Sequence, residues 1–121
     1  MATGKVKSAL TPERVNITAG TDISITRLDV FKMGDLLLLN GYAEVGDTAI
    51  SGNGYTIFTL PSGAIPSGTR RLTVCFRYNG SLRPDGTVNI ESNGNVRTAF
   101  GSGTIDADSA IIFYGSSVVL N

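Results

Sequence analysis

The chain has 121 residues, with ten basic and ten acidic side chains, no histidine and one cysteine. This length predicts one domain with its own core, and the zero net charge provides no field that would steer the protein toward nucleic acid. The missing histidine excludes a Ser-His-Asp triad and the commonest transition-metal ligand, while one cysteine excludes an internal disulfide. We therefore expect no enzymatic activity, no cofactor, no metal site and no nucleic-acid partner.

Residues 1–21 form a polar, weakly patterned segment that contains Pro12. They lack the apolar stretch of a signal peptide, and no apolar stretch of the sequence approaches the roughly 18 residues that would span a bilayer. We expect an N-terminal connector or poorly structured arm over residues 1–21 and a head domain over residues 22–121. The sequence predicts a protein made in the cytoplasm without a signal peptide and without membrane insertion.

Residues 23–33 alternate between apolar and polar side chains, but the phase of the alternation changes. The apolar positions are odd-numbered up to Ile25 and even-numbered from Leu28. A one-residue β-bulge across residues 26–27 would produce this shift. The turn-forming residues 33–35 (MGD) then predict a hairpin into the next strand.

Four consecutive leucines occupy residues 36–39. An extended strand points successive side chains to opposite faces, so both faces of this strand need an apolar cover. The alternative is one turn of a buried helix, against which Asn40-Gly41 argues because glycine weakens a helix interior by about 1 kcal/mol. No amphipathic helix supplies a cover, so we expect one face on the domain's own core and the other on a neighbouring subunit. The predicted subunit interface comprises Leu36, Leu37, Leu38, Leu39, Ile111, Ile112, Phe113 and Tyr114.

The middle of the sequence predicts a loop, a strand, a second loop and another strand. Residues 45–54 are rich in glycine, and residues 55–60 predict a short strand. Residues 61–68 contain two prolines, which lack an N–H for a central ladder, so this segment predicts a structured crossing loop. Residues 71–78 alternate most regularly and predict a half-buried strand, with Cys75 on its polar-looking face.

The last third of the sequence has closely spaced turn signals. Asn79-Gly80 and residues 84–86 (PDG) predict turns, and Asn93-Gly94 predicts a two-residue type I′ turn between two short strands. A glycine-rich loop, the apolar residues 110–114 and a terminal strand at residues 118–120 follow. With about eight to ten short strands at this spacing, we predict an all-β fold, an antiparallel β-sandwich of jelly-roll type.

One end of the predicted hairpin over residues 71–90 combines an aromatic ring with planar hydrogen-bonding side chains. A sugar ring has an apolar face surrounded by hydroxyl groups, so such a surface suits a glycan. An equally simple interpretation places the tyrosine in the core and the other side chains in solvent. The candidate glycan-binding residues are Arg77, Tyr78, Asn79, Arg83 and Asp85.

Asp106 and Asp108 are two residues apart in a predicted loop. Both carboxylates would point to the same side of an extended segment, where they would bind calcium or act as an acid and base pair. The simpler interpretation is two solvated acids in a loop, and the surrounding sequence favours it.

Residues 34–41 (GDLLLLNG), 60–66 (LPSGAIP) and 88–96 (VNIESNGNV) occur in this order and are followed by a final apolar strand. In this arrangement the sequence resembles the C-terminal head domains of phage and prophage tail-fibre or receptor-binding proteins. Those heads carry an apolar segment at the end of an opening strand pair, then a Leu-Pro-x-Gly-x-x-Pro loop, then a strand before a polar-Gly-Asn-Val turn. The resemblance covers residues 23–121, and the order is more specific than any single segment.

The resemblance implies a trimeric, jelly-roll-like head in the tail of a virion, where it contacts other tail proteins and adheres to a bacterial surface saccharide. Our leading hypothesis is therefore a non-enzymatic receptor-binding or structural head. The alternative is a monomeric carbohydrate-binding or accessory β-domain of a bacterial protein. A third hypothesis is a small hydrolase that uses Asp106, Asp108 or Glu91. Light scattering separates the first two hypotheses, because only the first requires a stable oligomer.

Overall fold

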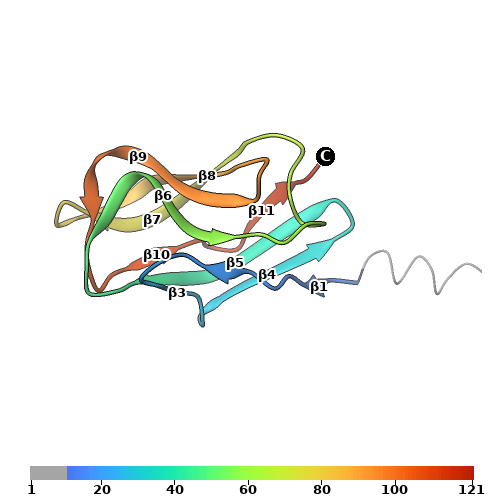
Figure 1. Cartoon of the computed structure of the whole chain (residues 1–121), viewed down its shortest axis with the longest axis horizontal. Helices are drawn as coiled ribbons and strands as arrows, with labels where there is room; N and C mark the ends of the chain where they lie inside the picture. The colour runs from blue at the N-terminus through green and yellow to red at the C-terminus, as the bar shows by residue number, and fades with distance from the viewer. Residues whose placement is uncertain (1–10) are drawn as a thin grey trace, which may run out of the picture.

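The computed structural model describes residues 11–121, and these residues form β-strands, turns and loops without a helix. Figure 1 shows the longer strands lying along the long axis of the molecule. The predicted all-β class is confirmed. The strands are β1 (Glu13–Arg14), β2 (Thr18–Ala19), β3 (Ile23–Ser24), β4 (Leu28–Met33), β5 (Leu36–Val45), β6 (Ile50–Thr59), β7 (Arg70–Tyr78), β8 (Ser81–Ile90), β9 (Asn95–Ile105), β10 (Ala110–Ile112) and β11 (Ser116–Val119).

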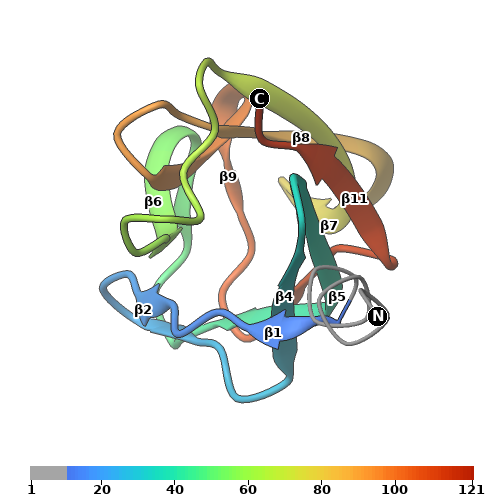
Figure 2. The same cartoon turned by 90° about the vertical axis from the view of Figure 1, so that its right-hand side faces the viewer.

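Antiparallel pairing joins these strands into one curled sheet. The strand order is β1-β4-β5-β10-β7-β8-β9-β6-β2, and β3 and β11 also pair with β5. Figure 2 looks along the long axis and shows the sheet rolling around a central core, with β1 and β2 next to each other where the roll closes. The predicted antiparallel sandwich corresponds to this arrangement, because opposite walls of the curled sheet pack on the same core.

The leucine segment forms the strand on which the sheet is organised. The first half of β5 lies between β4 and β11, and its second half pairs with β10 and β3. Backbone N–H and C=O groups on both sides of β5 therefore have ladder partners, which a central buried strand requires. The strand predicted for residues 36–39 is confirmed, and the helical alternative is wrong.

The core fills the interior of the curled sheet with side chains from every long strand. Phe58 and Phe113 are fully buried and meet edge to face, with ring centroids 5.9 Å apart. Leu37, Leu39 and Ile105 are also fully buried. Burial of one such side chain contributes about 1.5–3 kcal/mol, so this single apolar cluster provides the main stabilisation of the fold.

Residues 84–86, which the sequence predicts as a turn, lie inside β8. Val74 pairs with Gly86 but Phe76 pairs with Arg83, so two residues of β8 lie opposite one residue of β7. Such a bulge accommodates Pro84, which has no N–H for a regular ladder. Gly86 is required here because an added Cβ would lie 2.6 Å from the Phe76 ring.

Two predicted loops are also strands in the structure. Residues 51–54 belong to β6 and residues 101–105 belong to β9, and these two strands pair with several register shifts. Packing explains Gly52 and Gly103, because an added Cβ at these positions would lie 2.6 or 2.7 Å from the Tyr78 ring. A glycine that serves close packing carries the same sequence signal as a glycine in a turn.

The connections between strands differ from prediction in detail. The phase change at residues 26–27 corresponds to a turn between β3 and β4 rather than to a bulge within one strand. The connection from β8 to β9 spans residues 91–94, with Glu91 N donating to Asn95 O at 2.9 Å, so it is longer than the predicted two-residue turn.

Residues 11–21 add two short strands to the sheet. β1 pairs with β4 and β2 pairs with β6, so this segment bridges opposite walls of the roll. Val15 and Ile17 pack against the core from this position. The first ten residues of the predicted connector lie outside the described residues.

Candidate functional site

The first candidate site is the apolar outer face of the sheet around β5, on the side opposite the core. Strand register places Met33, Leu36 and Val119 side by side in one row, and the next row pairs Phe31 with Leu38. Directly paired residues share one face of a sheet, so these side chains form a continuous surface. The outer apolar face comprises Phe31, Met33, Leu36, Leu38 and Val119 and, beyond the polar row in which Asp29 pairs with Asn40, Tyr42, Ile112 and Tyr114.

Burial differs sharply between the two faces of β5. Leu37 and Leu39 are fully buried, whereas Leu36 and Leu38 are only half-buried. The fold of one chain therefore covers the inner face completely and the outer face only in part.

Exposed hydrophobic side chains concentrate on the same face. Tyr114 is 55% exposed and Val119 is 51% exposed. Among residues 11–121, the other large hydrophobic side chain exposed to this degree is Leu82, at 60%, which lies on the β7–β8 hairpin instead. The predicted interface residues Ile111 and Phe113 face the core, while Ile112 and Tyr114 lie on the outer side.

Tyr114 is held in an unusual backbone conformation. Its φ is 56° and that of the following Gly115 is 59°, both in the left-handed region. This conformation costs a non-glycine residue roughly 1–2 kcal/mol. A hydrogen bond with the thiol of Cys75 raises the pKa of the Tyr114 hydroxyl. Cys75 pairs with Ile112, so Tyr114 lies over the β7–β10 row of the outer face.

Charged side chains lie beside and between the residues of the outer apolar face. The guanidinium of Arg14 lies 4.9 Å from the centre of the Phe31 ring, and its Nη1 is 3.0 Å from Asp29 Oδ1. On the other side, Arg70 Nε donates to the Val119 carbonyl at 2.9 Å. An apolar centre with a polar rim is the usual composition of a protein interface.

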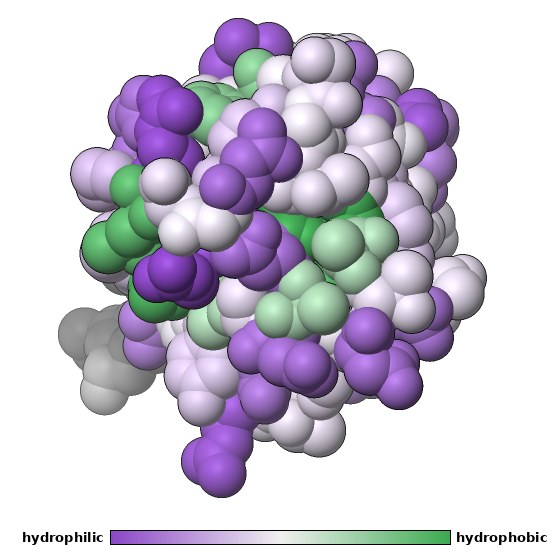
Figure 3. All heavy atoms as spheres, turned by 90° about the vertical axis from the view of Figure 1, so that its left-hand side faces the viewer, coloured by the Kyte–Doolittle hydropathy of each residue, from purple (hydrophilic) through white to green (hydrophobic). Residues whose placement is uncertain are grey.

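The second candidate site is the end of the β7–β8 hairpin, where the five predicted glycan-binding residues lie. Asn79 and Gly80 form its turn, with φ values of 50° and 82°. Figure 3 views this end of the molecule: hydrophilic and intermediate residues cover most of it, and hydrophobic residues appear near the centre and at one edge. The structure therefore brings the five residues together on one hairpin.

Tyr78 belongs to an aromatic cluster that closes this end of the core. Its ring lies 4.9 Å from Phe100 and 6.4 Å from Phe76, measured between centroids, and the contact with Phe100 is edge to face. Its hydroxyl accepts a hydrogen bond from Gly103 N at 2.5 Å. Tyr78 is half-buried, so only part of its ring is open to a ligand.

Arg83 and Asp85 form an ion pair over the same cluster. Arg83 donates from Nε and Nη2 to the two carboxylate oxygens of Asp85 at 3.0 and 2.8 Å. The guanidinium also lies 4.7 Å from the centre of the Phe100 ring. The hydrogen bond from Arg83 lowers the pKa of Asp85, and the reciprocal hydrogen bond raises the pKa of Arg83. Two hydrogen bonds hold the Arg83 guanidinium against Asp85 while it lies over the Phe100 ring. Donor and acceptor groups therefore lie at fixed positions beside aromatic carbon.

Arg77 and Asn79 bond to the hairpin turn and to residues at the end of β9 and just after it. Arg77 Nη2 donates to Gly80 O at 2.8 Å, and its Nε lies 3.6 Å from Asp106 Oδ2. Asn79 Oδ1 accepts from Thr104 N at 3.0 Å. Each of the polar side chains proposed from the sequence therefore already has a protein partner, and a ligand would add to or replace these bonds.

The sequence-based prediction of this site missed its aromatic and glycine partners. Phe100 provides the ring on which Arg83 stacks, and Gly52, Gly101 and Gly103 provide the space for the Tyr78 ring. The GSG sequence at residues 101–103 was the available signal, but it also fits a loop. The strand pairing that brings β6 and β9 to Tyr78 is non-local and leaves no short sequence motif.

The acidic pair at residues 106 and 108 is not arranged as a metal site. Asp106 Oδ1 accepts from Gly80 N at 3.0 Å and supports the hairpin turn, while Asp108 lies in a turn with φ 56°. Within residues 11–121, no three His, Cys, Asp or Glu side chains come together in a way that would hold a metal ion. The same residues include no helix long and apolar enough to cross a membrane.

Two open clefts lie elsewhere on the molecule, and the first borders the outer apolar face at Arg14. One has a volume of about 330 Å³ and lies between residues 13–16 and 61–64, with Lys32 in its lining. The other has a volume of about 400 Å³ and lies between residues 22–24 and 44–46. Neither brings together a set of side chains with recognisable catalytic geometry.

The structure defines the class of the protein as an all-β domain built on one curled antiparallel sheet. No family model matches the sequence, and no curated protein matches it. The fold is similar to that in the crystal structure of the receptor binding protein (gp15) of Listeria phage PSA, with a TM-score of 0.64. The similarity covers 99% of this protein and 71% of the phage protein at 16% sequence identity. At this identity the likeness establishes a shared fold.

Proposed function

We propose that the protein is the head domain of a phage or prophage tail-fibre or receptor-binding protein. In this proposal it assembles into a trimer through the outer apolar face and attaches the virion to glycans on the bacterial surface, without catalysing a reaction. The fold shared with a phage receptor binding protein supports the attachment role. The observation that carries the proposal is the apolar surface that Met33, Leu36, Val119, Phe31 and Leu38 form on the solvent side of β5.

The outer apolar face suits contact with further copies of the protein. The row of Met33, Leu36 and Val119 is apolar on three adjacent strands, and the charged Arg14 and Asp29 lie beside Phe31 and Asn40. In a closed three-fold ring each copy would contribute this face to one or both neighbours, so that no apolar edge remains open. Such an arrangement provides the second cover that the leucine segment requires.

Light scattering over a range of protein concentrations tests the trimer. The wild-type domain should have the mass of three protomers, and Leu38→Asp should have the mass of one protomer with unchanged circular dichroism. Leu82→Asp is the matched control, because Leu82 is 60% exposed on the hairpin and lies off the outer apolar face. A wild-type protein that stays monomeric at all concentrations would contradict the proposal and favour the accessory-domain alternative.

The proposed glycan site is the hairpin end formed by Arg77, Tyr78, Asn79, Arg83 and Asp85. Its Arg83–Asp85 pair provides donors and acceptors at fixed positions beside the Phe100 and Tyr78 rings. Hydroxyl groups of a sugar would bond to the polar edge while its apolar face contacts aromatic carbon. Because the Tyr78 and Phe100 rings are half-buried, only their exposed parts would contact a sugar, so the site would hold one edge of a sugar unit.

Binding of fluorescently labelled protein to host cells tests this site. Replacing Arg83 and Asp85 together with alanine should reduce cell binding, and purified cell-wall saccharide should compete with the wild-type protein. Arg71→Ala is the control, because Arg71 is an exposed arginine that bonds to Asn89 on another part of the sheet. Equal loss of binding in the control, or no loss in the double variant, would remove the hairpin end from the proposal. Release of sugar fragments from that saccharide would contradict the non-enzymatic role.

A further inference from the structure

Residues 60–66 (LPSGAIP) form a loop that has no part in the proposed subunit contact or in the hairpin end. Residues 61–64 of this loop make one wall of the cleft of about 330 Å³, and residues 13–16 make the other. Lys32 of β4 completes the lining. This volume falls at the lower end of the range that small-molecule sites occupy, so a ligand of the size of one sugar unit would fit.

Lys32 occupies a position where an apolar side chain is expected. It pairs with Leu37, and the residues two and four positions before it on the same strand, Val30 and Leu28, are buried. Directly paired residues share one face of a sheet, so Lys32 lies on the inner face of β4. It is half-buried and makes no ion pair or hydrogen bond within residues 11–121. The three N–H donors of its ammonium group are therefore available to a ligand in the cleft.

Glu13 lies beside Lys32 but is not bonded to it. Strand register pairs the two residues across β1 and β4, so both side chains lie on the same face of the sheet and next to the cleft. The two charged groups do not form an ion pair, and the Glu13 carboxylate has no other polar partner among the described residues. One acceptor group and one donor group of opposite charge therefore line the cleft from adjacent strands.

This combination of Glu13 and Lys32 restricts the chemistry of a ligand. A carboxylate only accepts hydrogen bonds and an ammonium group only donates them, whereas a hydroxyl group does both. An anion beside Glu13, or a cation beside Lys32, would face a like charge. A neutral ligand with several hydroxyl groups satisfies both side chains. Asn16 and Ser62 add an amide and a hydroxyl group to the lining, and neither side chain is bonded to another residue of the described chain.

Apolar groups in the same lining suit the ring of a sugar. Ala64 is 3% exposed, and Val15 is half-buried and packs against the core. Pro61 adds an exposed ring. The apolar face of a sugar would contact these groups while its hydroxyl groups bond to the polar side chains, which is the usual composition of a small-molecule site.

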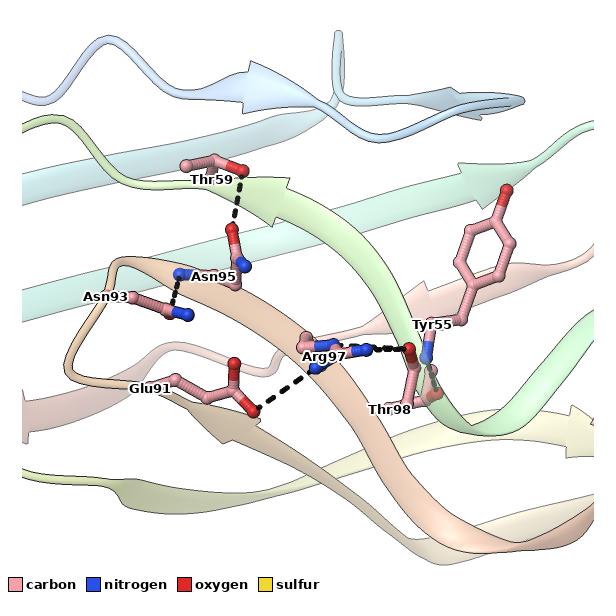
Figure 4. A network of polar contacts seen from close by, with 8 residues as sticks. Tyr55, Thr59, Glu91, Asn93, Asn95, Arg97 and Thr98 are labelled. Atoms are coloured by element: carbon pink, nitrogen blue, oxygen red, sulfur yellow. Dashed lines mark hydrogen bonds and ion pairs between the residues drawn. The ribbon is translucent and has the colours of Figure 1, made fainter.

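The loop wall of the cleft is fixed before a ligand binds. Leu60 N donates to Gly94 O at 2.8 Å, and the adjacent Thr59 donates to Asn95 Oδ1 at 3.2 Å (Figure 4). Gly63, at the turn of the loop, has a φ of 93°, in the left-handed region that glycine adopts without strain. A ligand would therefore order little of this wall, and preorganised walls favour affinity.

The opposite wall is bonded to β4. Val15 N donates to Val30 O at 2.8 Å. Arg14 Nη1 donates to Asp29 Oδ1 at 3.0 Å, and the same guanidinium lies over the Phe31 ring of the outer apolar face. The charge of Arg14 is therefore already balanced, which leaves the charges of Glu13 and Lys32 for a ligand.

We propose that this cleft is a binding site for one unit of a neutral saccharide, with hydroxyl groups that donate to Glu13 and accept from Lys32. The polar side chains of the hairpin end already have protein partners, whereas four polar side chains of the cleft have none within residues 11–121: Glu13, Asn16, Lys32 and Ser62. The site is separate from the hairpin end and requires no subunit contact, so it goes beyond the proposed function.

Titration of the isotope-labelled protein with monosaccharides, followed by two-dimensional NMR, tests the site. Glucose, galactose, rhamnose and N-acetylglucosamine are added separately at millimolar concentrations. At least one of them should shift the amide signals of residues 13–16, Lys32 and residues 62–64. Replacing Arg83 and Asp85 together with alanine should leave these shifts unchanged. No shift with any of the four sugars, or shifts confined to the hairpin end, would overturn the proposal.

Two charged probes test the chemical class of the ligand. Glycine carries an ammonium group and a carboxylate, and inorganic phosphate is an anion. Both should bind at the cleft more weakly than the best of the four sugars, because each places a like charge beside Glu13 or Lys32. Tighter binding of glycine or phosphate at the cleft than of every sugar would overturn the assignment to a neutral saccharide.

Substitutions at the two charged residues test their roles. Glu13→Ala and Lys32→Met should each weaken binding of the sugar about tenfold, because each removes a hydrogen bond to a charged group. Glu44→Ala is the matched control, because Glu44 is a carboxylate in the lining of the other cleft, and it should bind as wild type does. The same spectra show whether each variant is folded, and the exposed Glu13 provides the test if Lys32→Met unfolds. Wild-type affinity in folded Glu13→Ala would overturn the proposal.

Discussion

Leu37 and Leu38 are consecutive residues of β5 whose side chains lie on opposite faces of the sheet. Leu37 is fully buried in the core, whereas Leu38 is half-buried on the outer apolar face and pairs with Phe31. Both residues are leucine, so a difference in unfolding free energy between the same substitution at the two positions reflects their different surroundings. We use this pair to separate the stability of the single protomer from its assembly.

Leu37→Ala should destabilise the domain by about 2–5 kcal/mol, because it removes buried methyl groups and leaves a cavity in the core. Leu38→Ala should cost much less in the unfolding of a monomer, because Leu38 is half-buried and its truncation leaves no enclosed cavity. Chemical denaturation at low protein concentration measures the two free energies. A larger loss for Leu38→Ala than for Leu37→Ala would contradict the assignment of the two faces.

The sequence allowed the strand character of the leucine segment to be predicted, because four consecutive apolar residues flanked by Asn40-Gly41 fit a buried strand better than a helix. The all-β class followed in the same way from short apolar segments and turn residues. Strand pairing was beyond that reasoning, since it joins β6 to β9 and β7 to β10 across long stretches of sequence. The aromatic cluster at the hairpin end depends on this pairing, so Phe100 was not identified as its partner.

Proline and glycine residues account for most differences between the strands predicted from the sequence and the strands in the structure. Pro84 and Gly86 predict a turn, but a bulge opposite β7 satisfies the same backbone restrictions inside a strand. Gly103 predicts a loop, but it leaves space for a tyrosine ring. In both cases the residue suits a turn or loop as well as a position inside a strand. A contact with a distant part of the chain decides between them, and a single sequence does not reveal that contact.

Thr98 is the one buried polar side chain among residues 11–121, and its hydroxyl bridges the irregular part of β6. It donates to Ser51 O and accepts from Tyr55 N, each at 2.9 Å. Thr98→Val keeps the shape but leaves both backbone groups unpaired, so we expect a loss of about 1–3 kcal/mol in unfolding free energy. Thr98→Ser is the control, and it should retain more stability because it keeps the hydroxyl. Equal stability of wild type and Thr98→Val would show that water replaces this bridge.

Gly103 and Gly68 form a second matched pair. A Cβ at position 103 would lie 2.6 Å from Oδ1 of Asn79 and 2.7 Å from Cζ of Tyr78, whereas a Cβ at position 68 would meet the flexible end of Arg70 at 3.3 Å. Gly103→Ala should therefore cost about 1–3 kcal/mol through overpacking. Gly68→Ala should change the thermal midpoint little. Similar midpoints for the two variants would indicate that the Tyr78 ring moves freely.

The Arg83–Asp85 pair should make the stability of the folded domain depend on pH, with stabilisation lost at acidic pH. The hydrogen bond from Arg83 lowers the pKa of Asp85 below its ordinary value near 3.8, so the folded state holds the proton less tightly than the unfolded state. The stabilisation is therefore present above the unfolded pKa and is lost as the pH falls through the lower folded pKa. The thermal midpoint of wild type should exceed that of Asp85→Asn at neutral pH, and the difference should shrink below about pH 4.

The expected difference is small because the pair is solvent-exposed. Asp47→Asn serves as the control, because Asp47 is exposed and has no ion pair within residues 11–121. A wild-type advantage that grows as the pH is lowered would contradict the assigned role of Asp85.

Tyr114 combines a costly backbone conformation with an exposed ring on the outer apolar face, which predicts opposite effects of one substitution. Asparagine tolerates the left-handed region better than tyrosine, so Tyr114→Asn should stabilise the monomer by up to about 1 kcal/mol. The same substitution removes an aromatic side chain from the proposed subunit contact and should weaken assembly. Val119→Thr is the matched control, because it lowers the hydrophobicity of the same face without relieving backbone strain.

Denaturation at low concentration and sedimentation at high concentration separate the two effects of Tyr114→Asn. A variant that is less stable as a monomer would show that the contact of Tyr114 with Cys75 outweighs the backbone strain. A variant that assembles as well as wild type would place Tyr114 outside the subunit contact. If both predicted effects occur, the strain at position 114 is retained because the tyrosine ring serves assembly rather than the fold of the single protomer.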